Sequence, residues 1–202
     1  MQFDTALIRK HDVRGPRYTS YPTAVQFRDG FDPGHYVDAL QTAGKAARAE
    51  GQALPLSVYV PVPFCATVCY YCACNRIVTN DRSKAEVYMD YLQREMALHS
   101  RHVPPEHSVG QLHLGGGTPT YLDDAQLDAL VAGLYRHFRL SDDAERDFSV
   151  EIDPRTVDPE RIGFLGGLGF NRLSLGIQDF DPHVQEAVNR IQSERDTAAV
   201  VR

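Results

Sequence analysis

All four cysteines of the chain lie within ten residues, and this short segment is where chemistry is most expected. They are Cys65, Cys69, Cys72 and Cys74, in the spacing Cys-x3-Cys-x2-Cys-x-Cys. Thiolates bind iron–sulfur clusters and structural zinc, and paired thiols form disulfides. The segment therefore has four interpretations: a disulfide framework, a zinc site, a group of inert thiols, or an iron–sulfur cluster.

The compactness of the segment separates these interpretations. Disulfides are rare in cytoplasmic proteins, and structural zinc usually takes two separated pairs of ligands, whereas this sequence has no second pair. Inert buried thiols have no reason to cluster. An iron–sulfur cluster needs several thiolates around one compact cuboid, which a short loop can supply. Three thiolates would leave one iron of a [4Fe–4S] cluster open to a small ligand, as in catalytic zinc sites.

The segments that must position this loop alternate between strand and helix patterns. Asp32 before Pro33 predicts the start of one helix, and Ser83 with Glu86 predicts a capping box at the start of another. The predicted strands are 56–62, 109–114, 148–152 and 171–177, and the predicted helices are 34–50, 83–100, 124–138, 157–167 and one that begins after Ser193.

This alternation indicates an α/β fold with a parallel sheet, which is either open or part of a barrel. About four βα units are present, and the first residues, up to about 30, have no clean period, which predicts an extended arm. We divide the chain into an N-terminal arm and helix at 1–52 and a βα domain at 53–202. The last helix has no stop signal and the fourth strand would leave an uncovered edge. We therefore expect the domain to be incomplete at its C-terminus.

Within each predicted strand, polar residues alternate with apolar ones, so the polar side chains share one face. The opposite, apolar face would pack under helices, and in the fourth strand it includes Leu173, Leu175 and Ile177. The polar face would line a binding site, and its alternative role is a hydrogen-bonded polar core. The glycine run 115–117 would lie beside this site, and its alternative role is a tight turn between strand and helix. The polar residues that would converge there are Tyr59, His113, Glu151 and Gln178.

Composition narrows the classes of protein to which the chain can belong. Its 202 residues are 43% hydrophobic and 24% charged, as in an ordinary globular domain. The 21 basic and 27 acidic residues give a net charge of −6, which argues against nucleic acid as a partner. No apolar run reaches the roughly 20 residues that cross a membrane, and the first residues lack the apolar core of a signal peptide. We therefore predict a cytoplasmic protein with no membrane partner.

Seven stretches of sequence carry a resemblance that covers nearly the whole chain. The spacing Cys-x3-Cys-x2-Cys after the first strand of a βα barrel resembles the radical S-adenosylmethionine (SAM) superfamily. Within it, the chain is similar to the oxygen-independent coproporphyrinogen III oxidases. The arm and Cys74 favour these enzymes over the related haem chaperones, which generally lack both. The stretches are RGPRYTSYPTA (14–24), VPFC (62–65), CYYCACN (69–75), QLHLGGGTPTYL (111–122), EIDPR (151–155), FNRLSLGIQDF (170–180) and NRIQ (189–192).

The resemblance implies a partial parallel (β/α) radical SAM barrel and assigns roles to single residues. Cys65, Cys69 and Cys72 would hold a [4Fe–4S] cluster, and Cys74 would not be a ligand. Arg190 would bind the carboxylate of SAM, for which a guanidinium fork is suited. The other residues implied to bind SAM are Tyr59, Tyr71, Gly116, Gly117, Thr118, Glu151 and Gln178.

Some of these assignments go further. Tyr59 is also predicted to be catalytic, Glu151 and Gln178 to contact the ribose of SAM, and Tyr71 to contact its adenine through the backbone. The family usually has Phe in place of Tyr71. Pro61 is a plainer departure, because the family commonly has His at this position. By parity Pro61 shares the face of Tyr59, so we expect a changed pocket wall.

The implied reaction is the oxidative decarboxylation of two propionate side chains of coproporphyrinogen III to vinyl groups, giving protoporphyrinogen IX in porphyrin and haem biosynthesis. One electron from the cluster would cleave SAM, and the 5′-deoxyadenosyl radical would take hydrogen from the propionate β-carbon, with two SAM consumed. The implied partners are this substrate and a low-potential electron donor, and the expected state is a monomer. Family members continue beyond residue 202, so we expect this chain alone to be inactive.

Two alternatives stay open. The first is a haem chaperone of the same superfamily, which tight haem binding by the purified chain would favour. The second is a zinc-binding interaction domain, which retention of zinc without iron would favour.

Overall fold

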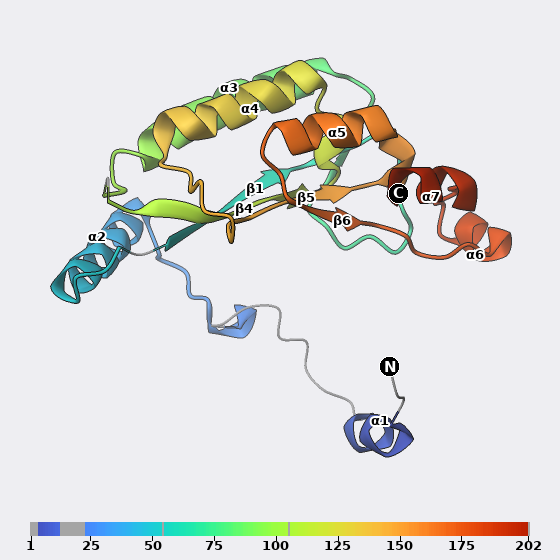
Figure 1. Ribbon diagram of the computed structural model, residues 1–202, viewed down its shortest axis with the longest axis horizontal. Helices are drawn as coiled ribbons and strands as arrows, with labels where there is room; N and C mark the ends of the chain where they lie inside the picture. Colours follow the sequence, from blue (N-terminus) through green and yellow to red (C-terminus); the bar gives the residue numbers. More distant parts are fainter. Residues whose placement is uncertain (1–3, 13–22, 54, 105, 202) are drawn as a thin grey trace. The chain divides into compact units, whose positions relative to one another are not determined.

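The computed structural model describes residues 4–12, 23–53, 55–104 and 106–201 (Figure 1). The chain forms two compact units, residues 1–36 and 37–202. The boundary that we place between residues 52 and 53 stays a prediction. Most of the predicted arm at 14–24 lies outside the described residues.

The N-terminal region contains a helix that the sequence analysis missed. This helix, α1 (Thr5–His11), begins after Asp4, whose side chain accepts hydrogen bonds from the backbone of the first turn. A short 3-10 turn, η1 (Ala24–Gln26), and helix α2 (Pro33–Ala49) follow. Helix α2 confirms the helix predicted at 34–50. Asp32 caps it as expected, because Asp32 Oδ1 accepts a hydrogen bond from the His35 amide at 2.9 Å.

A four-stranded sheet forms the centre of the second unit, and all of its strand pairs are parallel. The strand order β1-β4-β5-β6 follows the chain, as in a βα repeat that winds in one direction. This arrangement confirms the predicted α/β class. The strands are β1 (Pro55–Val62), β4 (Ser108–Gly116), β5 (Asp147–Ile152) and β6 (Arg172–Leu175).

Three helices cover one side of this sheet (Figure 1). They are α3 (Ser83–His99), α4 (Asp124–His137) and α5 (Pro159–Gly167). Between the helices and the sheet lies the hydrophobic core, built from the alternate apolar residues of the strands as predicted. Among the described residues, no helix combines the length and hydropathy that a membrane span needs. The fully buried core residues include Val62, Leu112, Leu114, Leu127, Leu130, Leu134, Phe148, Val150 and Leu165.

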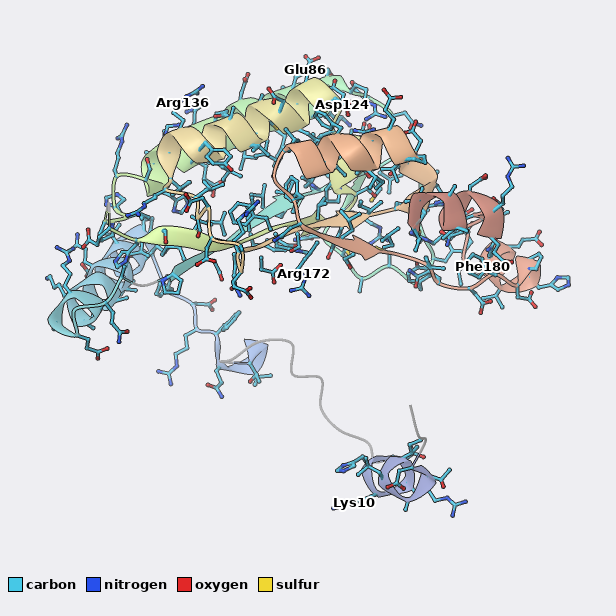
Figure 2. The ribbon with its side chains drawn as sticks, viewed as in Figure 1. Lys10, Glu86, Asp124, Arg136, Arg172 and Phe180 are labelled. Atoms are coloured by element: carbon cyan, nitrogen blue, oxygen red, sulfur yellow. The ribbon has the colours of Figure 1, made fainter. Side chains whose placement is uncertain are left out.

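The predicted capping box at Ser83 and Glu86 is wrong. Asp81 takes the capping role instead, since its Oδ1 accepts hydrogen bonds from the Ser83 amide at 3.1 Å and the Ser83 hydroxyl at 2.6 Å. Glu86 is exposed on the outer side of α3 (Figure 2). A true capping box lies at α4, where Asp123 and Gln126 each bond the other's backbone amide.

The fourth strand is shorter and less buried than predicted. Strand β6 ends at Leu175 rather than residue 177, and Leu173 and Ile177 are 37% and 38% exposed. Of the three predicted apolar residues, only Leu175 packs against the core. The reason is topological, because β6 has a single strand neighbour, β5, in the described sheet.

Three small elements near the cysteines were not predicted. A two-stranded parallel ladder pairs β2 (Phe64–Cys65) with β3 (Ile77–Val78), and a short helix, α6 (Pro182–Ala187), follows β6. The predicted last helix is confirmed as α7 (Glu194–Val201). Elements this short contain too few residues to show a hydrophobic period, so they can be recognised only from their contacts in the folded structure.

Candidate functional site

A cavity of about 530 Å³ opens at the C-terminal ends of the strands. Its walls come from the cysteine loop, the glycine run after β4, the end of β5, the end of β6 and the segment between α6 and α7. The cavity thus lies where parallel α/β folds place their sites. The residues predicted to bind metal or cofactor that line it are Cys65, Cys69, Cys72, Tyr71, Gly116, Gly117, Thr118, Glu151, Gln178 and Arg190.

The four thiols lie at the cavity and become more exposed along the loop. Cys65 and Cys69 are buried, Cys72 is half-buried and Cys74 is exposed, and none forms a disulfide. Cys65 Sγ lies 3.4 Å from the Thr118 hydroxyl oxygen. Burial raises the pKa of the Cys65 and Cys74 thiols, as expected for thiols with no cation directly on them.

Within the part of the chain that the structure describes, no three His, Cys, Asp or Glu side chains converge on the position of a single metal ion. A mononuclear zinc site needs its ligands around one point. An iron–sulfur cluster instead places each thiolate on a different iron, so its ligands surround a cuboid. The wide cavity between the cysteines suits the second arrangement better than the first.

Hydrogen bonds from three directions hold the cysteine loop in place. The β2–β3 ladder closes its base, with the Ile77 and Thr79 amides donating to the Pro63 and Cys65 carbonyls at 2.7 and 2.9 Å. At the tip, Arg76 Nη1 donates to the carbonyls of Cys72 and Cys74 at 3.0 and 3.1 Å. Arg76 was not predicted, because a lone arginine in a loop belongs to no recognisable pattern.

The segment after α6 also holds the loop. Asn189 Nδ2 donates to the Val68 carbonyl at 2.7 Å, and the Tyr70 amide donates to the Val188 carbonyl at 3.1 Å. Asn189 has φ of 54°, a left-handed conformation that Asn tolerates better than most residues. The stretch NRIQ at 189–192 therefore positions the cysteines as well as supplying Arg190.

The glycine run after β4 is crowded by the protein's own backbone. A Cβ atom on Gly117 would lie 2.9 Å from the Phe64 carbonyl oxygen and from the Pro63 carbonyl group, and Gly116 has φ of 103°. The run thus packs directly under the loop that begins at Cys65. It serves as a close-packed turn, and it also lines the cavity, so the two interpretations of the run are compatible.

The predicted convergence of polar side chains from the strands occurs for three of the four residues through direct contacts. The Tyr59 and His113 rings stack at 5.4 Å, and His113 Nε2 lies 3.3 Å from Glu151 Oε1. His113 Nδ1 also lies 2.7 Å from the Ser149 hydroxyl, and Glu151 Oε2 accepts the Gly116 amide at 3.2 Å. This chain of contacts fixes the Glu151 carboxylate at the cavity wall.

Tyr59 and Gln178 differ in whether they line the cavity. Gln178 lines the cavity, whereas Tyr59 is 56% exposed and is not among the described residues that line it. Partial burial and the charge of Glu151 raise the pKa of the Tyr59 hydroxyl. Pro61, the departure from the family pattern, is exposed two residues further along the same strand. Its carbonyl accepts a hydrogen bond from the Tyr88 hydroxyl.

Arg190 is the buried cation of the site. Its Nη1 lies 3.5 Å from Cys69 Sγ, and its Nη2 donates to the Gly176 carbonyl at 2.8 Å. Its Nε is buried without a hydrogen-bond partner among the described residues. Arg190 therefore has one buried donor that no described residue satisfies.

Asp153 and Arg155 form a second charged group that the sequence analysis did not assign. Arg155 Nη2 donates to Asp153 Oδ2 at 2.7 Å, and Arg190 Nη2 lies 3.4 Å from Asp153 Oδ1. Burial alone would raise the pKa of Asp153, but the hydrogen bonds from Arg155 and the charge of Arg190 outweigh it and lower the pKa. In the stretch EIDPR only Glu151 was given a role. The acid and base two positions apart, Asp153 and Arg155, could have indicated an ion pair.

Comparison with known proteins agrees with this geometry. The profile of the radical SAM superfamily matches residues 59–202. The chain is 50% identical over 201 residues to the oxygen-independent coproporphyrinogen III oxidase of Pseudomonas aeruginosa, covering 100% of this chain and 42% of that enzyme. It is 44% identical to the enzyme of the same name from Escherichia coli K12, covering 96% of this chain and 40% of that enzyme.

A solved structure gives the same relationship. The coproporphyrinogen III oxidase from Escherichia coli, described as a radical SAM enzyme, matches with a TM-score of 0.82 and 40% identity over 99% of this chain. The chain spans 42% of that structure, so the likeness covers less than half of the complete enzyme. Radical SAM proteins use a [4Fe–4S] cluster and SAM, for which the cysteine loop and the cavity beside it supply suitable groups. The chain belongs to the radical SAM superfamily.

Proposed function

We propose that this chain supplies the cluster-binding and SAM-binding part of an oxygen-independent coproporphyrinogen III oxidase. The observation that carries the proposal is the cavity in which Cys65, Cys69 and Cys72 meet Arg190 and Glu151. Thiols can bind a cluster, a buried cation can pair with the carboxylate of SAM, and a carboxylate can accept hydrogen bonds from its ribose hydroxyls. The relatives at 50% and 44% identity, which carry this enzyme name, support the choice of substrate.

Cys65, Cys69 and Cys72 would hold the cluster. The first two are buried and the third is half-buried, so the cluster would lie away from bulk water. Arg76 and Asn189 would keep the loop in its binding conformation through their hydrogen bonds to loop carbonyls. Cys74 is exposed and lies beside Cys72, and we propose that it is not a ligand.

Arg190 would orient SAM by donating to its carboxylate, which would satisfy the unpaired Nε. Glu151 would accept the ribose hydroxyls, held in place by His113 and the Gly116 amide. When bound, the cluster and SAM supply one-electron chemistry and a radical that removes hydrogen. The remaining proposed contacts are Gln178 to the ribose, Tyr71 to the adenine, the backbone of Gly116 and Gly117 with Thr118 along the cavity wall, and Tyr59 as a catalytic side chain.

In the proposed reaction, each of the two reacting propionate side chains of coproporphyrinogen III loses one hydrogen atom from its β-carbon. Loss of carbon dioxide and of one electron to a one-electron acceptor then leaves a vinyl group. The protein residues bind, orient and shield the reacting groups. We also propose a low-potential electron donor as partner, a monomeric state and a cytoplasmic location, where the four free thiols would remain reduced. Because the chain spans 42% of its relative, turnover would need the rest of the enzyme.

The test is anaerobic reconstitution of the chain with iron and sulfide, followed by EPR spectroscopy of the reduced protein with and without SAM. The expected result is a [4Fe–4S] signal that changes when SAM is added, because SAM occupies the open iron. Replacement of Cys65, Cys69 or Cys72 by Ala should abolish the signal. The matched control is Cys74→Ala, which removes a thiol from the same loop and should keep the signal.

A folded chain that retains zinc and takes up no iron would overturn the proposal. Loss of iron from the Cys74→Ala protein would overturn the ligand assignment alone. Circular dichroism of each variant shows whether the chain is folded and so separates loss of a ligand from loss of the fold.

A further inference from the structure

We propose that Arg155 is a positioning residue that raises the reduction potential of the cluster by holding positive charge against the sulfur of Cys69. The inference rests on the proposed function, because it takes Cys69 as a cluster ligand. Arg155 Nη2 lies 3.9 Å from Cys69 Sγ, across 86 positions of sequence. None of the roles assigned above uses this side chain.

The guanidinium of Arg155 is locked in place by one carboxylate. Its Nη2 donates to Asp153 Oδ2 at 2.7 Å, and its Nε donates to Asp153 Oδ1 at 3.0 Å. The backbone amide of Arg155 also donates to Asp153 Oδ1 at 3.0 Å. The Arg155 side chain is 23% exposed, so little of it can move freely in water. A fork held at this many points loses little freedom when it also faces a sulfur.

Asp153 is in turn fixed where β5 ends. It precedes the 3-10 turn η3 (Pro154–Thr156), and the Thr156 hydroxyl donates to its carbonyl at 2.8 Å. Asp153 is 8% exposed and its pKa is lowered, so it is a buried carboxylate that stays ionised. The fixed end of a central strand therefore determines where the Arg155 charge lies.

The charge balance around Cys69 is positive. Arg155 and Arg190 both face its sulfur, at 3.9 and 3.5 Å, and they share the single carboxylate of Asp153. In the proposed complex the carboxylate of SAM would neutralise Arg190. Asp153 would then stay paired with Arg155, and Arg155 Nη2 would still present a charged N–H group to Cys69 Sγ.

The other buried thiol has a different environment. Cys65 Sγ faces the neutral hydroxyl of Thr118 at 3.4 Å, whereas Cys69 faces two guanidinium groups. Reduction adds negative charge to a cluster, and nearby positive charge and N–H donors to sulfur stabilise that charge. Arg155 thus makes the cluster easier to reduce by the electron donor, and it acts on the cluster side that Cys69 binds.

The test is a potentiometric titration of the reconstituted full chain without SAM, followed by EPR. Arg155→Gln should make reduction about tenfold less favourable, as expected for loss of one charge-assisted hydrogen bond, which is a downward shift of about 59 mV for a one-electron couple. Arg155→Lys keeps the positive charge but lacks the guanidinium group, so the reduction potential of the cluster should fall by less than in Arg155→Gln. The matched control is Arg161→Gln, because the Arg161 side chain is also 23% exposed and pairs with an aspartate, Asp124, and neither residue lines the cavity. It should titrate as the wild type does.

Each outcome decides the question. If Arg155→Gln binds iron fully and titrates at the wild-type potential, the inference is overturned while the proposed function stands. If Arg155→Gln and Arg155→Lys both lose the cluster although folded, Arg155 retains the cluster rather than tuning it, which also overturns the inference. If the wild-type chain is folded, retains zinc and takes up no iron, the proposed function fails together with the inference.

Discussion

At the scale of single residues, the position of the Arg190 side chain depends on Gly176 having no side chain. Arg190 Nη2 reaches the Gly176 carbonyl at 2.8 Å, and a Cβ atom on Gly176 would lie 2.8 Å from that same Nη2. The glycine is therefore required by the arginine beside it. This contact joins the residue that follows β6 to the segment after α6, at the point where SAM would bind.

Replacing Gly176 by Ala should displace the Arg190 side chain and weaken SAM binding by about tenfold, the size of one hydrogen bond between charged groups. The fold should persist, because the displaced atom is the end of a flexible side chain. Isothermal titration of the reconstituted protein with SAM measures the effect. Gly166→Ala is the control, since a Cβ atom there meets nothing within 4 Å. Equal SAM affinity in the two variants would contradict the role given to Arg190.

At the scale of elements, the cysteine loop is built from pieces too short to be recognised by their periodicity. The β2–β3 ladder has two residues in each strand, and α6 has six residues. Their positions follow from pairing with distant segments, such as Asn189 with Val68. The long helices behave differently, because each has its own apolar stripe and a local start signal.

Helix α4 offers a test of local start signals. Asp123→Ala should destabilise the chain by about 1 kcal/mol, because it removes the acceptor of the Gln126 amide at 2.8 Å. Asp128→Ala, an exposed change in the second turn of the same helix, should have little effect. Glu86→Ala should also cost only a few tenths of a kcal/mol, since Glu86 points outward rather than capping α3. Urea unfolding curves measure all three, and a large loss in Glu86→Ala would restore the capping box that the structure contradicts.

At the scale of the whole molecule, the helical layer and the sheet are joined by polar contacts as well as by the core. The Tyr88 hydroxyl on α3 donates to the Pro61 carbonyl on β1, and the Tyr88 ring meets Phe64 edge-on at 5.6 Å. Burial, with smaller contributions from Glu95 and Tyr59, raises the pKa of Tyr88 to about 12. The folded chain therefore holds the Tyr88 proton more tightly than the unfolded chain does.

This shift predicts a loss of stability at alkaline pH. The contribution of Tyr88 is fully present below about pH 10, where unfolded tyrosine titrates, and it is lost as the pH rises toward about 12. Between pH 9.5 and 12 the melting temperature of Tyr88→Phe should fall less than that of the wild type, because phenylalanine has no proton to lose. Tyr91→Phe removes an exposed tyrosine from the same helix and should keep the wild-type profile. Identical alkaline profiles for the wild type and Tyr88→Phe would contradict the assignment.

The sequence by itself determined the four strands, the long helices and the parallel α/β class, because apolar residues repeat with the period of each element. It also pointed to Cys65, Cys69 and Cys72, because their spacing is compact and local. The sequence failed at Ser83, where Asp81 makes the competing hydrogen bond, and at Leu173, where β6 has only one strand neighbour in the described sheet. These failures lie where a neighbouring group, rather than the local pattern, decides the outcome.

Only the tertiary structure decided which charges face which sulfur. Arg155 and Arg190, which share the carboxylate of Asp153, face Cys69 across 86 and 121 positions of sequence. Spacing along a chain describes local geometry, whereas burial and electrostatics depend on which segments the fold brings together. The crowding of Gly117 by the Pro63 backbone has the same origin. The local spacing of the cysteines thus indicates cluster binding. The charges that would set the properties of the cluster come together only through tertiary packing.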